Sequence, residues 1–361
     1  MRIKNLPALA VIVLSAIASC SKSSSNNSPT PITSDPPTTN PAVDVYVSGF
    51  TTATNGTHTA TYWKNGTATS LTDNNLLASD GVGITVNGND VYVVGFTQFG
   101  RDSSAVYWKN GSITQLPYNS KSSVANAIVV NGADIYVAGT TTMNNKGYHQ
   151  ATYWKNGVAT PLTDISFGSI GTAITVNGSD VYVAGFVLTS TNTLEAAYWK
   201  NGALTILPDN SLGSTAYAIL VNGSDIYIGG SSNTNGGGLA TYWKNGVTIA
   251  LDNAGAKYGL IGGLALKGSD VYIAGSRVMA SGNYVASYWK NGVLTDLAGV
   301  LPGSEASAIA LNGTDVYIAG NTSPNNSFNP VASYWKNGVP VTLTTPGGPV
   351  SYALGIAVVP R

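Results

Sequence analysis

Few side chains in this sequence are suited to acid–base or metal chemistry. Histidine occurs twice, as His58 and His149, each just before a repeated aromatic segment. The single cysteine, Cys20, lies near the N-terminus, so no cysteine farther along can act as a nucleophile. No His-x-x-x-His or Asp-x-Asp spacing indicates a metal site. We therefore expect no cofactor and no bound metal.

Carboxylates outside the repeats are scattered, and two of them could be brought together. Asp80 and Glu305 each precede a segment that we expect to form the innermost strand of its repeat, so they could meet near the centre of a ring. Two carboxylates within roughly 5 to 10 Å can hydrolyse a glycosidic bond. One alternative is thus a polysaccharide hydrolase or lyase, and the other is two solvated loop acids.

The elements that must position these residues belong to a unit that returns every 44 to 46 residues. Its most regular part is "YWKNG", which starts at Tyr62, Tyr107, Tyr153, Tyr198, Tyr242, Tyr288 and Tyr334. Each unit divides into strand-sized pieces, such as "DVYVAG" at 180–185 and "ATYWK" at 151–155, and Asn-Gly after the lysine indicates a type I′ hairpin. Four antiparallel strands per unit, repeated seven times, predict an all-β, seven-bladed β-propeller.

The two ends of the chain predict how the ring closes. The first repeat begins at Asp44 and lacks the "AITVNG" strand that precedes "DVYVAG" in the other repeats. The missing piece appears at 353–359 as "ALGIAVV". We expect this C-terminal strand to join the N-terminal partial blade, because closure removes open sheet edges. The propeller would then span residues 43–361.

The repeated aromatic and charged residues are assigned to the scaffold. One Trp per blade should pack against the neighbouring blade. One Asp before each Val/Ile-Tyr strand can accept backbone N–H bonds, and one Lys before each Asn-Gly can stay solvated. The alternative, a calcium site at each Asp, is disfavoured because calcium needs six to eight converging oxygens.

The order of these motifs resembles that of the HAF-type extracellular repeats. In that family an "AFLW-x-x-G" strand, a leucine-centred strand, an "A-x-x-I-N" strand and a "G-x-V-V-G" strand recur. Here "ATYWKNG", "LTD", "AITVNG" and "DVYVAG" stand in those places. The resemblance implies an extracellular propeller and no particular reaction.

Binding residues are expected on the face that carries the variable loops. The hairpins of one face are uniform Asn-Gly turns, whereas the other connections differ from blade to blade, and variable loops on a rigid scaffold usually carry binding. Aromatic residues outside the repeat pattern could stack on a sugar or grip a peptide there. They are Phe99, Tyr118, Tyr148, Phe167, Tyr258, Tyr284 and Phe328.

The N-terminal segment predicts export and lipid anchoring. Arg2 and Lys4 precede an apolar run at 6–18, which is too short to span a bilayer and is typical of a cleavable signal at 1–19. Its end, "AIASC", resembles the lipobox of bacterial lipoproteins, which implies lipidation of Cys20. Residues 20–42 are rich in Ser, Asn, Thr and Pro and should form a disordered tether.

Composition narrows the function class further. Only 9% of the residues are charged and the net charge is zero, so we expect no nucleic-acid partner. Serine after Cys20 favours the outer membrane, with the head facing either the periplasm or the outside. The sequence thus predicts a lipid-anchored envelope protein with a monomeric, noncatalytic propeller that binds a glycan, peptide or protein. The alternatives are the exported polysaccharide hydrolase or lyase and a purely structural envelope protein.

Overall fold

The computed structural model describes residues 42–71, 78–118, 122–142, 148–162, 167–209, 212–235, 237–297, 303–323, 329–346, 348 and 350–361. Every regular element in these ranges is a β-strand. No helix among them is long and apolar enough to cross a membrane. The signal peptide, Cys20 and most of the tether lie outside the described residues, so their predicted roles stay predictions.

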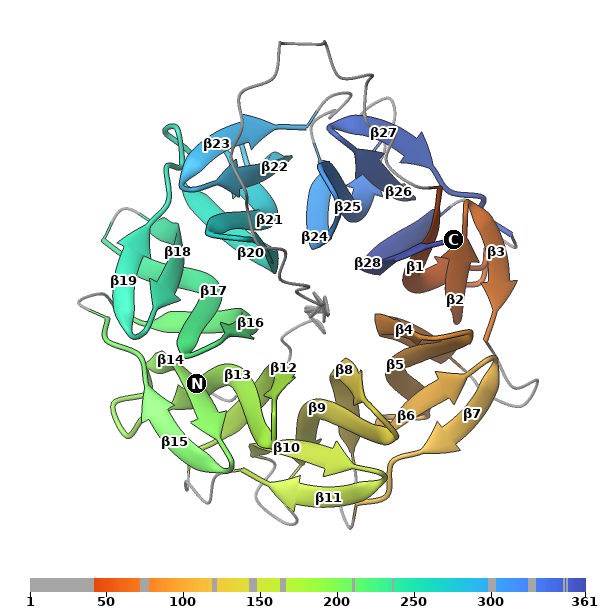
Figure 1. The fold of residues 1–361 in the computed structure, drawn as a ribbon, viewed down its shortest axis with the longest axis horizontal. Helices are drawn as coiled ribbons and strands as arrows, with labels where there is room; N and C mark the ends of the chain where they lie inside the picture. The colour runs from red at the N-terminus through yellow and green to blue at the C-terminus, as the bar shows by residue number, and fades with distance from the viewer. Residues whose placement is uncertain are drawn as a thin grey trace, which may run out of the picture.

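The strands fall into four classes by their distance from the centre of Figure 1. The innermost are β4 (Ala78–Asn87), β8 (Ser123–Asn131), β12 (Ser169–Asn177), β16 (Ser214–Asn222), β20 (Tyr258–Lys267), β24 (Glu305–Asn312) and β28 (Val350–Pro360). The second strands are β1 (Val43–Thr52), β5 (Asp90–Phe99), β9 (Asp134–Thr142), β13 (Asp180–Leu188), β17 (Asp225–Thr234), β21 (Asp270–Val278) and β25 (Asp315–Thr322). The third strands are β2 (His58–Lys64), β6 (Asp102–Lys109), β10 (His149–Lys155), β14 (Leu194–Lys200), β18 (Gly237–Lys244), β22 (Tyr284–Lys290) and β26 (Val331–Lys336). The outermost are β3 (Thr67–Ser70), β7 (Ser112–Gln115), β11 (Val158–Pro161), β15 (Ala203–Ile206), β19 (Val247–Ala250), β23 (Val293–Asp296) and β27 (Val339–Thr342).

These strands pair in the order inner, second, third, outer, and they are antiparallel within each four-stranded unit, which we call a blade. Over the described residues the pairing gives five sheets of four strands and one of eight. The eight-stranded sheet arises because Gly238 of β18 pairs in parallel with Tyr258 of β20, which joins two blades. The blades surround a common centre in Figure 1, so the fold is of the β-propeller type.

Two kinds of two-residue turn connect the strands. After each third strand, the Asn and Gly of "KNG" both have positive φ, for example 51° at Asn65 and 86° at Gly66, as a type I′ turn requires. Between the inner and second strands, Asn87 pairs with Asp90 and the loop begins at Gly88, with φ of 58°. The glycine there is the first loop residue, as in a type II′ turn, so the asparagine ends the strand instead of entering the turn.

The repeated tryptophans hold neighbouring blades together, as predicted. All seven side chains are fully buried. Trp154, for example, packs among Ala105 and Leu116 of the preceding blade, and its indole N–H donates to the carbonyl of Pro117 at 3.2 Å. Buried aromatic area with a satisfied N–H is a strong stabilising contact, so "YWKNG" is explained as architecture.

The chain ends pair with each other. β28 runs antiparallel to β1 from Val43 opposite Pro360 to Thr52 opposite Val350. The resulting sheet has the order β28, β1, β2, β3, in which the C-terminal strand takes the innermost place. The indole N–H of Trp63 also donates to the carbonyl of Thr344 at 2.6 Å, across 281 positions of sequence.

Candidate functional site

The candidate site is formed at one register position of the inner strands, near their first residues. Each strand places one half-buried or buried side chain there, beside a buried serine or, in β20, a glycine. A β-bulge follows at once in every inner strand, and such bulges often re-aim side chains near active sites. Around the ring the residues are Asp80, Val124, Ile170, Thr215, Leu260, Glu305 and Tyr352.

Three neighbouring positions of this set carry titratable groups. Glu305 in β24, Tyr352 in β28 and Asp80 in β4 belong to adjacent blades, with Tyr352 in the middle. The sequence singled out Asp80 and Glu305 but placed them before their strands, whereas the structure places both inside them. The inner strand β28, which carries Tyr352, lies between β24 and β4, the strands that carry the two acids.

Asp80 binds the histidine that begins the third strand of the preceding blade. Nδ1 of His58 lies 2.9 Å from Oδ1 of Asp80, with the imidazole 39% exposed and the carboxylate 14% exposed. The hydrogen bond to Asp80 raises the pKa of His58, burial lowers it, and the negative charge of Asp80 raises it further, so the net direction is upward. A proton held on Nδ1 leaves Nε2 as the acceptor in the neutral ring.

Phe50 connects this pair to Tyr352. Its ring stacks on His58 with centroids 4.3 Å apart and an interplanar angle of 16°, and on Tyr352 at 4.8 Å and 25°. Phe50 is opposite Tyr352 in the β1–β28 ladder, which brings residues from the two ends of the chain into contact. The stack restricts the orientation of both outer rings, and stacked rings of this geometry stabilise one another.

Glu305 is the second acid–base group. Burial raises the pKa of its carboxyl group, and contact with the Asn321 side chain opposes part of the rise. Asn321 lies opposite Glu305 in the β24–β25 ladder and accepts the N–H of Ala353, next to Tyr352, at 2.9 Å. Burial and the nearby charge of Glu305 raise the pKa of Tyr352. Because the pKa of Glu305 is raised, its carboxyl group keeps its proton to higher pH than that of an ordinary glutamate.

The arrangement has the parts of a general acid–base site. His58, oriented by Asp80, can take a proton through Nε2, and Glu305 can donate one. Two titratable groups whose surroundings assign them opposite roles are characteristic of such sites. Sequence reasoning did not connect His58 or Tyr352 with these acids, although a repeat-by-repeat alignment would have shown three titratable residues where the other blades have Val, Ile, Thr and Leu.

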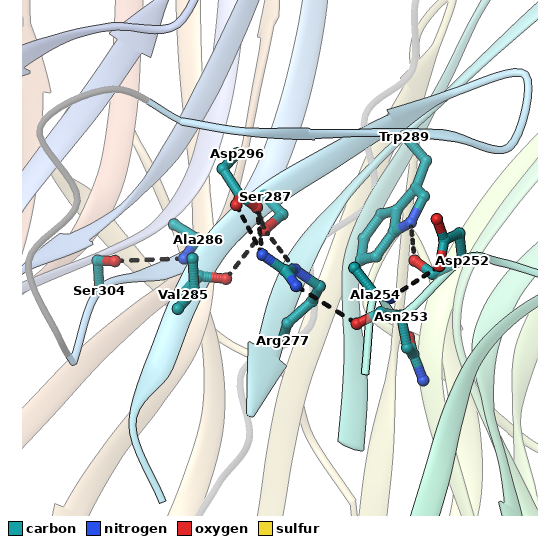
Figure 2. A network of polar contacts seen from close by, with 10 residues as sticks. All are labelled: Asp252, Asn253, Ala254, Arg277, Val285, Ala286, Ser287, Trp289, Asp296 and Ser304. Atoms are coloured by element: carbon teal, nitrogen blue, oxygen red, sulfur yellow. Dashed lines mark hydrogen bonds and ion pairs between the residues drawn. The ribbon is translucent and has the colours of Figure 1, made fainter. Parts of the chain in front are cut away.

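A second polar cluster, drawn in Figure 2, lies in the blade of β20 to β23. Both Nη2 distances from Arg277 to the carboxylate oxygens of Asp296 are 2.7 Å. Nη1 donates to the carbonyl of Asn253 at 3.3 Å and Nε to the hydroxyl of Ser287 at 3.4 Å, while Ser287 also donates to Asp296 at 2.8 Å. Each nitrogen of the guanidinium is occupied, so this cluster is structural.

The repeated charges form ion pairs near the Asn-Gly turns. In the blade of β8 to β11, Lys155 lies 2.8 Å from Asp134 and 5.1 Å from the ring centroid of Tyr136. Asn156 donates to the same carboxylate at 2.7 Å. The lysine is 47% exposed and so stays solvated as predicted, but it also pairs with the aspartate, which the sequence did not indicate. The same Lys–Asp pairing occurs seven times in the described part of the chain.

Four of the predicted binding aromatics are dispersed over several blades. Phe99 is 76% exposed at the hairpin that leads to β6, and Phe167 is exposed before β12. Tyr148 is exposed before β10, and the Tyr118 hydroxyl donates to Gln150 at 3.3 Å. None of these four rings stacks on another predicted aromatic in the described part of the chain.

The remaining three aromatics differ in their relation to the site. Tyr258 and Tyr284 are both opposite Val278, on either side of β21, and the Lys257 ammonium lies 5.2 Å from the Tyr258 ring. Tyr284 holds the repeat position in β22 that His58 holds in β2, and Glu305 on the next inner strand corresponds to Asp80. Phe328 lies outside the described residues.

Metal binding would require a larger set of ligands than this site offers. In the described ranges, no three or more His, Cys, Asp or Glu side chains gather closely enough to hold an ion. His58 and Asp80 alone would leave most of a coordination sphere to water.

Comparison with known proteins gives a structural match and no sequence match. No protein-family model and no curated protein matches the chain. Among solved structures, the fold is similar to a puromycin-hydrolyzing peptidase from Mycobacterium tuberculosis, with a TM-score of 0.55 and 13% identity. The match covers 84% of this chain and 52% of that one, so the chain spans about half of the peptidase's length.

The similar structure is a peptidase, and this finding goes against the prediction of a noncatalytic binding protein that is not an enzyme; it agrees better with the predicted alternative of a hydrolase. At 13% identity, and over about half of the peptidase, the likeness shows the fold alone. Any reaction must therefore be argued from the residues of the site.

Proposed function

We propose that this protein is a hydrolase whose site lies among the inner strands β24, β28 and β4. His58, held by Asp80, activates a water molecule through Nε2, and Glu305 donates a proton to the leaving group. Tyr352 lies between them on β28, where its neutral hydroxyl can donate a hydrogen bond to the substrate.

The observation that carries the proposal is the asymmetry of one register position. On three adjacent blades it holds Glu305, Tyr352 and Asp80. Glu305 is half-buried and desolvation raises the pKa of its carboxyl group, whereas Asp80 binds a histidine. A scaffold role gives no reason for this difference, because the other blades pack with Val, Ile, Thr or Leu at the same place.

Hydrolysis fits the site better than polysaccharide lyase chemistry does. A lyase abstracts a proton next to a uronate carboxylate and needs a cation to stabilise the charge that develops. The seven register positions include no Lys and no Arg. A substrate that carries no charged group next to the scissile bond therefore fits the site better.

We further propose that the fold is a seven-bladed propeller closed by β28. Seven Trp residues, seven Lys–Asp pairs and the pairing of β28 with β1 support it. Arg361 adds an ion pair to Asp44 at 2.6 Å, next to this junction. The resemblance to HAF-type repeats and to lipoprotein signals supports an exported protein anchored through lipidated Cys20 in the outer membrane.

The proposal is tested by assaying the full-length chain for release of reducing ends from neutral polysaccharides and of chromophore from ester and amide substrates. An acid and a base of this kind can serve all three linkages. His58→Ala should lower the hydrolysis rate about 100-fold or more. His149→Ala is the matched control, because His149 begins β10 as His58 begins β2, but the next inner strand carries Ile170 in place of Asp80. Equal rates for His58→Ala and the unmodified chain, or no hydrolysis of any substrate, would refute the proposal.

A further inference from the structure

The blade that carries Glu305 also contributes a buried amide, the side chain of Asn321 on the second strand β25. Asn321 lies opposite Glu305 in the β24–β25 ladder and is only 1% exposed. Residues that face each other in an antiparallel pair have Cβ atoms about 4.5 to 5.5 Å apart and lie on the same face of the sheet. The amide and the carboxyl group are therefore neighbours within one blade.

A backbone hydrogen bond fixes the orientation of this amide. Oδ1 of Asn321 accepts the N–H of Ala353 on β28 at 2.9 Å. Because the carbonyl oxygen is used in this way, the NH₂ group is left as a donor. Nδ2 is buried, and no atom in the described part of the chain accepts a hydrogen bond from it. A buried donor without an acceptor is unfavourable, so we expect Nδ2 to gain a partner at some stage of the reaction.

The equivalent position of the neighbouring blade shows how much of this side chain the backbone requires. Ser276 lies opposite Leu260 in the β20–β21 ladder, and its hydroxyl accepts the N–H of Ala306 at 3.0 Å. Asn321 makes the same kind of contact one blade farther along the chain. A serine is thus sufficient as the acceptor, and Nδ2 is the additional atom that Asn321 supplies. It is supplied where the inner strand carries Glu305 in place of a leucine.

The electrostatics of Glu305 agree with this geometry. Burial raises the pKa of its carboxyl group, and contact with the Asn321 side chain opposes part of the rise. A donor beside a carboxyl group favours the ionised form, because the carboxylate is the stronger acceptor. The amide therefore acts on Glu305 in the direction expected of a donor.

The other strands packed against β24 bring no competing charge to Glu305. On β28, burial and the charge of Glu305 raise the pKa of Tyr352, and β22 begins with a second tyrosine, Tyr284. On β21, Arg277 is bound by Asp296. No lysine or arginine of the described chain contributes to the shift of the Glu305 pKa, which leaves the amide as the group that favours the carboxylate.

From these contacts we propose that Asn321 is a positioning residue for the acid: Oδ1 is held by the N–H of Ala353, and Nδ2 donates to the carboxylate that Glu305 becomes on losing its proton. The inference rests on the proposed hydrolase and adds a residue to its site. The O–H bond of Glu305 breaks as its proton binds the leaving oxygen or nitrogen, and the electron pair stays on the carboxylate. The proton that His58 took from water then returns to Glu305 and restores the site.

The first experiment needs no substrate, because the chain contains two glutamates, Glu195 and Glu305. The full chain, labelled with ¹³C at the glutamate side-chain carboxyl carbon, gives one NMR signal for each, and Glu305→Gln identifies the second. Titration with pH then measures the pKa of Glu305, with Glu195 as the internal reference. Asn321→Ser keeps an acceptor for the backbone N–H and removes the amide, so the pKa of Glu305 should rise by about one unit.

Ser276→Ala is the matched control, because it removes the acceptor of the Ala306 N–H, next to Glu305, but no amide. It should lower the denaturation midpoint and leave the pKa of Glu305 unchanged. An unchanged pKa in Asn321→Ser would overturn the inference, and His58-dependent hydrolysis by the same chain would still keep the hydrolase. Equal rises in Asn321→Ser and Ser276→Ala would also overturn it, since the cause would then be altered packing.

The second experiment measures kcat/KM against pH on the substrates that the unmodified chain hydrolyses. In Asn321→Ser, the limb of the profile that matches the NMR pKa of Glu305 should move upward by the shift that NMR measures. A raised NMR pKa with an unmoved limb would overturn the positioning role. A raised NMR pKa in Asn321→Ser alone, without hydrolysis of any substrate, would support the contact between amide and carboxylate and overturn the hydrolase.

Discussion

Arg277 and His58 each belong to a polar cluster that occurs at one place in the ring, yet the two clusters use their hydrogen bonds differently. Arg277 is 7% exposed, and its guanidinium nitrogens are taken by Asp296, Ser287 and the carbonyl of Asn253. His58 is 39% exposed and has one ring nitrogen bound to Asp80. The first cluster stabilises its surroundings, and the second keeps a reactive atom available.

Their positions in the fold explain this difference. Arg277, Ser287 and Asp296 lie on the second, third and outer strands of one blade. Arg277 also donates a hydrogen bond to the carbonyl of Asn253, in the segment that follows the last strand of the preceding blade. The His58 cluster lies between two blades, because His58 begins the third strand β2 and Asp80 belongs to the inner strand β4 of the next blade. The first cluster is thus held largely within one blade, and the second spans the junction of two.

The largest expected effect is on catalysis, from Asp80→Asn. The amide cannot hold the Nδ1 proton as the carboxylate does, so His58 loses its tautomer and the support that raises its pKa. The hydrolysis rate should fall by about 10²- to 10⁴-fold. Rate measurements together with an NMR titration of the His58 ring test both points. An unchanged pKa of His58 in the variant would show that Asp80 does not act on the histidine.

The next effect is on stability, from Asp296→Ala. Removing the carboxylate leaves the buried Arg277 without its main partner. Because Asp296 itself is 49% exposed, water can partly replace its carboxylate, and the loss should be about 1 to 3 kcal/mol. Denaturant unfolding measures this loss, and activity per folded molecule should not change. The double variant Arg277→Leu with Asp296→Leu should recover most of the stability, since no charge is then left unpaired. A fully stable Asp296→Ala would show that solvent compensates the guanidinium.

A smaller effect is expected from Glu305→Gln, and it depends on pH. The folded-state pKa of Glu305 is raised, so its contribution to stability is complete below the ordinary value of 4.5 and is lost as pH rises through the folded pKa. The glutamine variant should therefore gain stability over the unmodified chain as pH rises above 4.5, and the gain should level off once the folded carboxyl group has ionised. Unfolding at several pH values measures the difference, and parallel curves would contradict the burial of this acid.

The smallest effect is expected from Lys155→Met, which removes one of the repeated surface ion pairs. The pair is solvated, so the denaturation midpoint at neutral pH should not change measurably. The lowered pKa of Asp134 contributes to stability above its ordinary value of 3.8 and the contribution is lost as pH falls through the folded pKa, so any small difference between the two chains should disappear in acid. A clear loss of stability at neutral pH would show that the Lys–Asp pairs stabilise the fold, as the Arg277 cluster is expected to do.

The sequence by itself determined the local structure, because strand, turn and interblade contact depend on residues that recur at fixed spacing. Alternating Val, Tyr and Ile favour strands, Asn65-Gly66 favours a type I′ turn, and Trp63 and its equivalents are buried as predicted. The pairing of 353–359 with the first repeat was also predicted, from the strand missing at one end and left over at the other.

Only the tertiary structure decided which nonrepeated residues meet. His58 and Asp80 are 22 positions apart and on different blades, while Phe50 and Tyr352 come together because the chain ends share a sheet. Glu305 belongs to the neighbouring sheet. No local pattern encodes such contacts, since they depend on strand register and on the position of each blade around the axis. For the same reason no local pattern indicated that a histidine on one blade would bind an aspartate on the next.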